Sequence, residues 1–170
     1  PLAELVNRAL LLAEAGGYAA GHALIHTYAR QELAADAVHV VYGHGGEKVK
    51  QEFAESSVNW VLQAEQLGTG HAVQQAMPLL QDDGVTLVLS GDVPLTQVPT
   101  LQALLQASQG TQLALLTLQM AQPTGYGRIV RNAHGEVQAI VEEKDATPEQ
   151  RLIQEIYSGI MAVPTRMLRT

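Results

Sequence analysis

Residues 85–95 read VTLVLSGDVPL, an apolar run that ends abruptly in a glycine, a carboxylate and a proline. A continuous Val/Leu run of this length is typical of a strand buried on both faces of a parallel sheet, and such sheets bind ligands beyond the carboxyl ends of their strands. Asp92 would then lie at the mouth of a binding crevice, where a carboxylate suits a hard cation such as Mg²⁺. On this segment alone Asp92 could equally cap a turn after a core strand.

Strands and helices alternate along the chain on both sides of this run. Apolar and β-branched stretches predict further strands at 38–42, 58–62 and 112–117, and helical spacing predicts helices at 47–53, 71–80 and 100–107. This alternation predicts an α/β fold with a mostly parallel central sheet and helices on both of its faces. No repeat, low-complexity stretch or linker composition interrupts it, so we expect one domain over residues 1–170.

Beyond Pro123 the sequence no longer alternates between strand and helix patterns. Two apolar stretches, 127–130 and 137–141, flank His134-Gly135, and they predict an antiparallel hairpin added to the main sheet. The segment 147–150, TPEQ, combines an N-cap threonine, a proline at the first helical position and a glutamine three residues on, which predicts a helix start. A last strand is expected over 156–163.

Composition excludes several classes of function. The formal charge of −7 argues against a broad nucleic-acid-binding face, which needs clustered cations. The chain has no cysteine, so it holds no disulfide, thiolate metal site or cysteine nucleophile, and it suits a reducing cytoplasm. The aliphatic run 9–13 is far too short to span a bilayer, and we expect a protein that is neither exported nor bound to a membrane.

Two loops have residues that suit a nucleotide or a sugar. Gly68-Thr69-Gly70 offers backbone N–H groups and a hydroxyl at a helix N-terminus, and Gln63 offers a paired donor and acceptor that matches the imide edge of a pyrimidine. The loop 123–128, PTGYGR, contains glycines, which allow a ligand hydroxyl to come close to the backbone. The carboxylates at 142–143 could accept hydrogen bonds from sugar hydroxyls. A helix cap and ordinary solvated loops are the alternatives for these segments.

Four segments taken together resemble one known family. They occur in the family's order and spacing: 63–72 QAEQLGTGHA, 91–95 GDVPL, 123–128 PTGYGR and 141–147 VEEKDAT. From about Leu24 to Ile160 the chain resembles the uridyltransferase domain of the bacterial bifunctional N-acetylglucosamine-1-phosphate uridyltransferase / glucosamine-1-phosphate acetyltransferase.

The resemblance implies a fold, a reaction and a setting. The fold would be the Rossmann-like nucleotidyltransferase fold. The reaction would join UTP and N-acetylglucosamine 1-phosphate into UDP-N-acetylglucosamine and pyrophosphate with Mg²⁺, in the cytoplasm, for peptidoglycan and lipopolysaccharide synthesis. The full-length enzyme would be a homo-oligomer, a trimer, assembled through its carboxyl-terminal domain.

The resemblance also assigns roles by position. Asp92 would be the catalytic residue and magnesium ligand. The uridine would contact Gln63, Gly68, Thr69, Ala13 and Gly16. The sugar would contact Ser90, Gly127, Glu142 and Tyr157.

The chain departs from the family pattern in three places. The basic phosphate clamp has no counterpart near Gly17 and Tyr18, and we expect a triphosphate-binding loop there that this sequence does not include. Ser90 stands where the family has tyrosine, and Tyr157 stands where it has asparagine. The domain is therefore expected to be incomplete at that loop and at its carboxyl end. A nucleotidyltransferase with another base or sugar, or a non-catalytic nucleotide-sugar-binding module, is the alternative.

Overall fold

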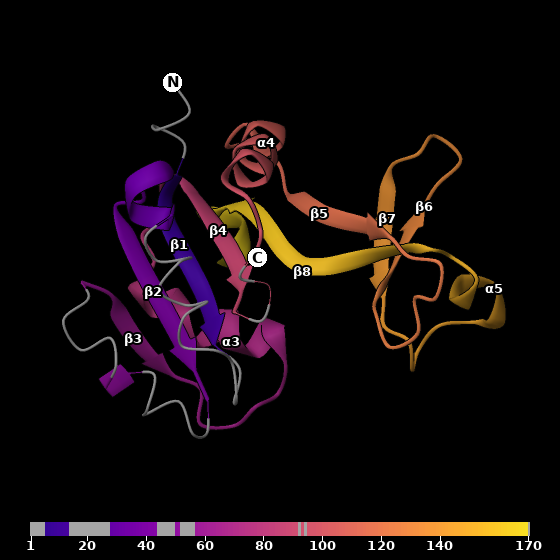
Figure 1. Cartoon of the computed structure of the whole chain (residues 1–170), viewed down its shortest axis with the longest axis horizontal. Coiled ribbons are helices and arrows are strands. Elements are labelled where there is room, and N and C mark those ends of the chain that lie inside the picture. Colours follow the sequence, from indigo (N-terminus) through magenta and orange to yellow (C-terminus); the bar gives the residue numbers. More distant parts are fainter. Residues whose placement is uncertain are drawn as a thin grey trace. The chain divides into compact units, whose positions relative to one another are not determined.

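The computed structural model describes residues 6–13, 28–43, 50–51, 57–91, 93 and 95–169, with side chains from Arg30 onward. It consists of two compact units, Pro1–Ala114 with Met161–Thr170, and Leu115–Ile160 (Figure 1). Each unit is described by itself.

The first unit is built on a parallel sheet. Its strands lie in the order β3-β2-β1-β4, and every neighbouring pair is parallel. The strands are β1 (Val6–Ala13), β2 (Ala37–Tyr42), β3 (Asn59–Leu62) and β4 (Val85–Ser90). Met161–Pro164, the last part of β8 (Glu155–Pro164), pairs antiparallel with β4.

Three of these strands confirm the sequence predictions, and β4 is buried from Val85 to Leu89, as expected for a strand covered on both faces. Strand β1 was not predicted, although it lies in the middle of the parallel strands. The aliphatic run 9–13, too short for a membrane span, is the second half of this strand.

Helices cover the parallel sheet. They are the π-helical turn η2 (Tyr28–Glu32), α3 (Thr69–Ala76), the 3-10 turn η3 (Met77–Leu79), α4 (Val98–Ser108) and the 3-10 turn η4 (Thr165–Arg169). The predicted helices at 71–80 and 100–107 are thereby confirmed. The one predicted at 47–53 falls mostly outside the described residues, of which Lys50 and Gln51 are helical.

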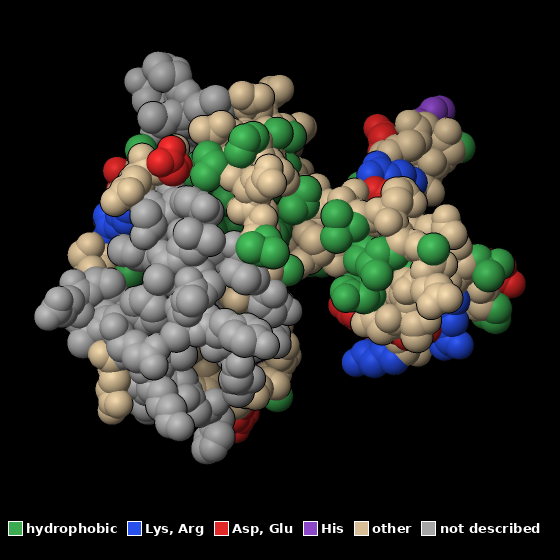
Figure 2. Space-filling model, viewed as in Figure 1, with side chains coloured by type: hydrophobic (Ala, Val, Ile, Leu, Met, Phe, Trp, Pro, Cys, Tyr) green, Lys and Arg blue, Asp and Glu red, His purple; other side chains and the backbone are tan. Residues whose placement is uncertain are grey.

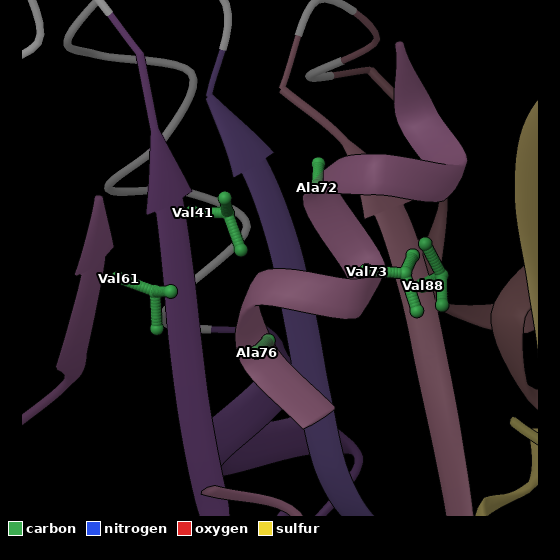
Figure 3. Close-up of a cluster of buried hydrophobic side chains, with 6 residues drawn as sticks. All are labelled: Val41, Val61, Ala72, Val73, Ala76 and Val88. Atoms are coloured by element: carbon green, nitrogen blue, oxygen red, sulfur yellow. The ribbon is translucent and has the colours of Figure 1, made fainter. Parts of the chain in front are cut away.

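Helix α3 closes a core of small side chains over the sheet (Figure 3). Its Ala72, Val73 and Ala76 pack with Val41 of β2, Val61 of β3 and Val88 of β4. Small residues on the helix allow its axis to come close to the strands. The N-cap of α3, Gly68, bonds to Gln63 directly after β3, so the helix begins near the carboxyl end of that strand. No described helix is long and apolar enough to cross a bilayer.

The second unit is antiparallel. Strand β6 (Arg128–Arg131) pairs with β7 (Val137–Val141) in the predicted hairpin, and β6 also pairs with the first part of β8 through Arg128 and Ile156. Strand β5 (Ala114–Gln119) pairs with β8. The short helix α5 (Pro148–Arg151) begins in a capping box in which Thr147 and Gln150 bond to each other's backbone N–H, as the sequence predicted.

Candidate functional site

The carboxyl ends of the four parallel strands meet at one edge of the sheet. Ala13 at the end of β1 aligns with Tyr42 at the end of β2, and Tyr42 aligns with Leu62 at the end of β3. Ser90, the last residue of β4, aligns with Leu12. Open α/β sheets bind ligands at this edge. Three predicted site positions therefore reach it: Ala13, Ser90, and Gln63, which directly follows β3.

Two predicted site residues lie outside the described residues. Gly16 falls in the stretch after β1, and Asp92 directly follows the buried Gly91 at the end of β4. Their assigned roles stay predictions.

Gln63 is held by three hydrogen bonds. Its backbone N–H donates to the carbonyl of Tyr42 at 2.8 Å. Its buried side-chain amide donates from Nε2 to the carbonyl oxygen of Gly68 at 3.1 Å, and the same Nε2 lies 3.1 Å from Nδ1 of His71. The contact with Gly68 uses one amide hydrogen, and the contact with Nδ1 uses the second in the tautomer that leaves Nδ1 unprotonated. In that arrangement Gln63 offers a ligand its amide oxygen alone, where the sequence predicted a paired donor and acceptor.

The Gly68-Thr69-Gly70 turn leads directly into α3. Gly68 is the N-cap at φ +98°, in the left-handed region that favours glycine, and Thr69 is the first helical residue. The turn is exposed, a side chain added at Gly68 would meet nothing within 4 Å, and no side chain caps the helix. The first N–H groups of a helix have no partner inside it. The turn therefore presents backbone donors, and the carbonyl of Gly68 in it accepts from the side chain of Gln63, which directly follows β3.

The second unit brings three predicted sugar-contacting residues together. The backbone N–H of Tyr157 in β8 donates to the carbonyl of Gly127 at 3.0 Å. A Cβ at Gly127 would lie 3.5 Å and 3.6 Å from the carboxylate oxygens of Glu142, at the other side of the hairpin's open end. Glu142 is exposed, and burial raises the pKa of Tyr157 to about 12, so its phenol stays neutral at neutral pH. Around Gly127 the cluster offers one carboxylate and main chain.

An ion pair beside these residues was not predicted. Arg128, only 1% exposed, donates to Glu143 Oε2 at 2.6 Å and to the carbonyl of Tyr126, while the N–H of Gly125 donates to the same carboxylate oxygen at 3.3 Å. The pair fixes the loop in which Gly127 lies. The sequence held one signal for it: Arg128 and Glu143 each stand next to a predicted sugar-contacting residue, with opposite charges.

Charged side chains of both signs are interspersed over the second unit (Figure 2). A second pair joins Arg131 to Glu155, with Nε and a terminal guanidinium nitrogen donating to the two carboxylate oxygens at 2.8 Å and 2.6 Å. The hydrogen bond from Arg131 lowers the pKa of Glu155. The two pairs tie β6 to the segments on either side of it.

The Glu143 pair predicts a pH-dependent stability. The hydrogen bond from Arg128 holds the pKa of Glu143 below its ordinary value of 4.5. A lowered pKa in the folded state contributes stability above pH 4.5, and that contribution is lost as the pH falls through the folded pKa. We expect the melting temperature of Glu143→Gln to lie below that of the unsubstituted protein at pH 7, and the gap to close as the pH is lowered from 5 to 3. A gap that stays constant over this range would contradict the role given to the ion pair.

A family model matches most of the chain. The model of the MobA-like NTP transferase domain matches residues 11–159, which cover most of both units.

Curated bacterial proteins match the chain at more than half identity. The bifunctional protein GlmU of Polaromonas naphthalenivorans (strain CJ2) is 59% identical over 148 residues, which cover 81% of this chain and 31% of that protein. The bifunctional protein GlmU of Marinobacter nauticus is 53% identical over 152 residues, with 88% and 34% covered. The chain thus spans about a third of the length of these relatives.

Solved structures share the fold. CMP:2-keto-3-deoxy-manno-octonic acid synthetase in complex with CTP is similar with a TM-score of 0.69 at 15% identity, covering 95% of this chain and 75% of that one. UDP-glucose pyrophosphorylase in complex with UDP-glucose is similar with a TM-score of 0.68 at 16% identity, covering 96% and 78%. The predicted Rossmann-like nucleotidyltransferase fold is confirmed.

Proposed function

This chain belongs to the MobA-like NTP transferase domain family, and on that premise we propose that it transfers the uridylyl group of UTP to N-acetylglucosamine 1-phosphate. The products are UDP-N-acetylglucosamine and pyrophosphate. The observation that carries the proposal is the buried Gln63 amide beside the exposed Gly68-Thr69 turn at the carboxyl edge of the sheet. The high identity to GlmU proteins supports it, as do the neighbours' complexes with a nucleotide and a nucleotide sugar.

The first unit would hold the nucleotide. The acceptor oxygen of Gln63 suits the ring N–H of uracil, and backbone N–H groups at the start of α3 suit carbonyl or phosphate oxygens. Ala13 is the last residue of β1, which pairs with β2, and Gly16 follows Ala13 in the sequence, so both fit a role at the same edge.

The second unit would hold the sugar. Glu142 can accept sugar hydroxyls, and the main chain at Gly127 lies beside it. Tyr157, in place of the family's asparagine, adds a neutral phenol, which can donate to a sugar oxygen. Ser90, in place of the family's tyrosine, belongs to the first unit at the end of β4.

The reaction needs alignment rather than a covalent intermediate. A phosphate oxygen of the sugar phosphate attacks the α-phosphorus of UTP in line, the bond to the bridging oxygen breaks, and pyrophosphate leaves. The protein contributes to this reaction by holding the two substrates in line. Charge on the phosphates must be offset, and the chain has a formal charge of −7.

The sequence places one carboxylate, Asp92, two residues beyond the end of β4 at this edge, and a carboxylate suits a magnesium ion. No group of three or more His, Asp or Glu side chains that could hold a metal occurs among the described residues. Mg²⁺ is commonly bound by one or two carboxylates together with substrate phosphates, so such a group is not required. Asp92 would hold the ion, which when bound neutralises phosphate charge.

The wider setting is proposed from the family resemblance. The product would supply peptidoglycan and lipopolysaccharide synthesis in the cytoplasm. The longer protein would be a homotrimer formed through a carboxyl-terminal acetyltransferase domain. Gel filtration with light scattering of the longer protein tests the trimer.

Pyrophosphate release tests the proposal. The protein is incubated with Mg²⁺, N-acetylglucosamine 1-phosphate and either UTP, CTP or GTP, and then with UTP and other sugar 1-phosphates. Release with UTP and N-acetylglucosamine 1-phosphate above all other combinations supports the proposal. Preference for another pair would indicate a related nucleotidyltransferase. Binding of UDP-N-acetylglucosamine without any release would indicate a non-catalytic module.

Gly127→Ala is expected to raise the KM for the sugar phosphate several-fold while leaving the KM for UTP unchanged. The new methyl group would stand 3.0 Å from Ile140 Cγ2 and against the Glu142 carboxylate, so it occupies the space beside the proposed sugar ligand. Steady-state kinetics with each substrate varied in turn measures both values.

Gly135→Ala is the matched control. Gly135 lies in the turn of the same hairpin at φ +82°, so alanine there is strained and lowers stability, but it is at the opposite end of the hairpin from Gly127. Its KM for the sugar phosphate should match that of the unsubstituted protein. Equal KM changes in the two variants would show a general loss of stability instead of a local effect.

A further inference from the structure

His71 lies between two glutamines in the first turns of α3. Its Nδ1 is 3.1 Å from Nε2 of Gln63, and its Nε2 is 3.0 Å from the amide nitrogen of Gln75 one turn along the helix. The imidazole is partly buried, so these side chains are its neighbours on both edges of the ring.

The direction of these hydrogen bonds can be worked out. The carbonyl of Gly68 only accepts, so the Gln63 amide must turn its NH₂ group toward it. The second hydrogen of that NH₂ group points to His71, whose Nδ1 must then accept. A neutral imidazole accepts at only one nitrogen, so the proton then lies on Nε2. The amide group of Gln75 lies 3.0 Å from this nitrogen, and with its oxygen and nitrogen interchanged, which keeps the heavy-atom positions, its oxygen accepts that proton.

These hydrogen bonds determine which atom of the Gln63 amide remains for a ligand. Two acceptors, the Gly68 carbonyl and His71 Nδ1, hold both amide hydrogens, and only the amide oxygen is left to meet a ligand. Turning the amide over would set its oxygen against the Gly68 carbonyl oxygen and the His71 lone pair. Each of the two contacts opposes this flip, and a buried unsatisfied acceptor pair is costly.

We propose that His71 is a positioning residue that sets the base preference of this site. By holding Gln63 as an acceptor, it favours a base with a ring N–H at the contacted position, as in uracil, and disfavours cytosine, whose N3 is itself an acceptor. This rests on the proposed function in one respect, namely that the base of the nucleotide contacts Gln63. The role of His71 goes beyond the proposed function, because it identifies the residue and the hydrogen-bond direction that distinguish uracil from cytosine.

Three variants separate positioning from packing. His71→Phe keeps a flat ring and removes the acceptor, His71→Asn returns an acceptor oxygen close to the Nδ1 position, and Gln75→Ala removes only the partner at the far edge of the ring. Should the Phe variant fail to fold, His71→Ala takes its place. Melting temperature checks the fold of each.

The preference for UTP over CTP is measured in two ways. One is the ratio of the kcat/KM values for the two nucleotides in pyrophosphate release, and the other is the ratio of their affinities in calorimetric titration without sugar phosphate. We expect the ratio to fall about tenfold in His71→Phe, to recover in His71→Asn, and to stay unchanged in Gln75→Ala. A folded His71→Phe protein with an unchanged ratio, or with equal losses for both nucleotides, overturns the proposal. If the unsubstituted protein releases no pyrophosphate, the proposed function fails, and the calorimetric ratio still decides the role of His71.

Discussion

Replacing Asp92 with alanine is expected to lower pyrophosphate release by roughly 10²- to 10³-fold, in the range found when one group that stabilises transition-state charge is removed. The residue directly follows Gly91, at the end of the strand whose last residue, Ser90, pairs with Leu12 at the carboxyl edge of the sheet. In the proposed role the Asp92 carboxylate offsets phosphate charge through a bound cation, so the substitution should affect the rate far more than the melting temperature. Initial rates at saturating UTP and Mg²⁺ give the comparison.

Asp83→Ala is the control for this variant. Asp83 is an exposed carboxylate in the loop before β4, at the opposite end of the same strand. It should retain the unsubstituted rate. If Asp92→Ala turns over as fast as Asp83→Ala, Asp92 has no part in the mechanism.

Leu87→Ala is expected to lower the free energy of unfolding by about 3 kcal/mol, within the 2–5 kcal/mol typical of fully buried leucines. Leu87 is 0% exposed in the middle of β4 and aligns with Ala9 of β1 on one side and Ala162 of β8 on the other. Its small neighbours leave the leucine side chain to fill the space, so truncation leaves a cavity. Urea denaturation followed by circular dichroism measures the change.

Leu152→Ala makes the same chemical change at a site that is 81% exposed. Its cost should stay within about 0.5 kcal/mol, as for most surface substitutions. A loss below 1 kcal/mol at Leu87 would show that the strand is less enclosed than its burial indicates.

Local chemistry predicted most elements of the fold. The run VTLVLS became β4 over Val85–Ser90, and the Thr147 capping box formed because its bonds join residues three apart. Strand β1 was missed for a physical reason. An uninterrupted aliphatic run has no periodicity that separates a buried strand from a buried helix, and its place between β2 and β4 depends on partners far away in sequence.

The sequence predicted which of the site residues lie together, but not the direction of their hydrogen bonds. The sequence placed Gln63, Gly68 and Thr69 together, and the structure has them within one hydrogen-bonded turn. The amide hydrogens of Gln63 face His71 and the Gly68 carbonyl, and only the folded chain brings these groups to Gln63. The Arg128–Glu143 pair likewise arises from the register of β6 and β7.

The contact between Tyr157 and Gly127 affects which residues the fold accepts at position 157. It runs from one main-chain N–H to one main-chain carbonyl, so any residue but proline at position 157 can make it. This backbone contact, and with it the course of the loop that carries Gly127, can therefore be kept when the side chain at position 157 differs. Since position 157 is proposed to face the sugar, such a difference would alter the acceptor site without rebuilding the loop.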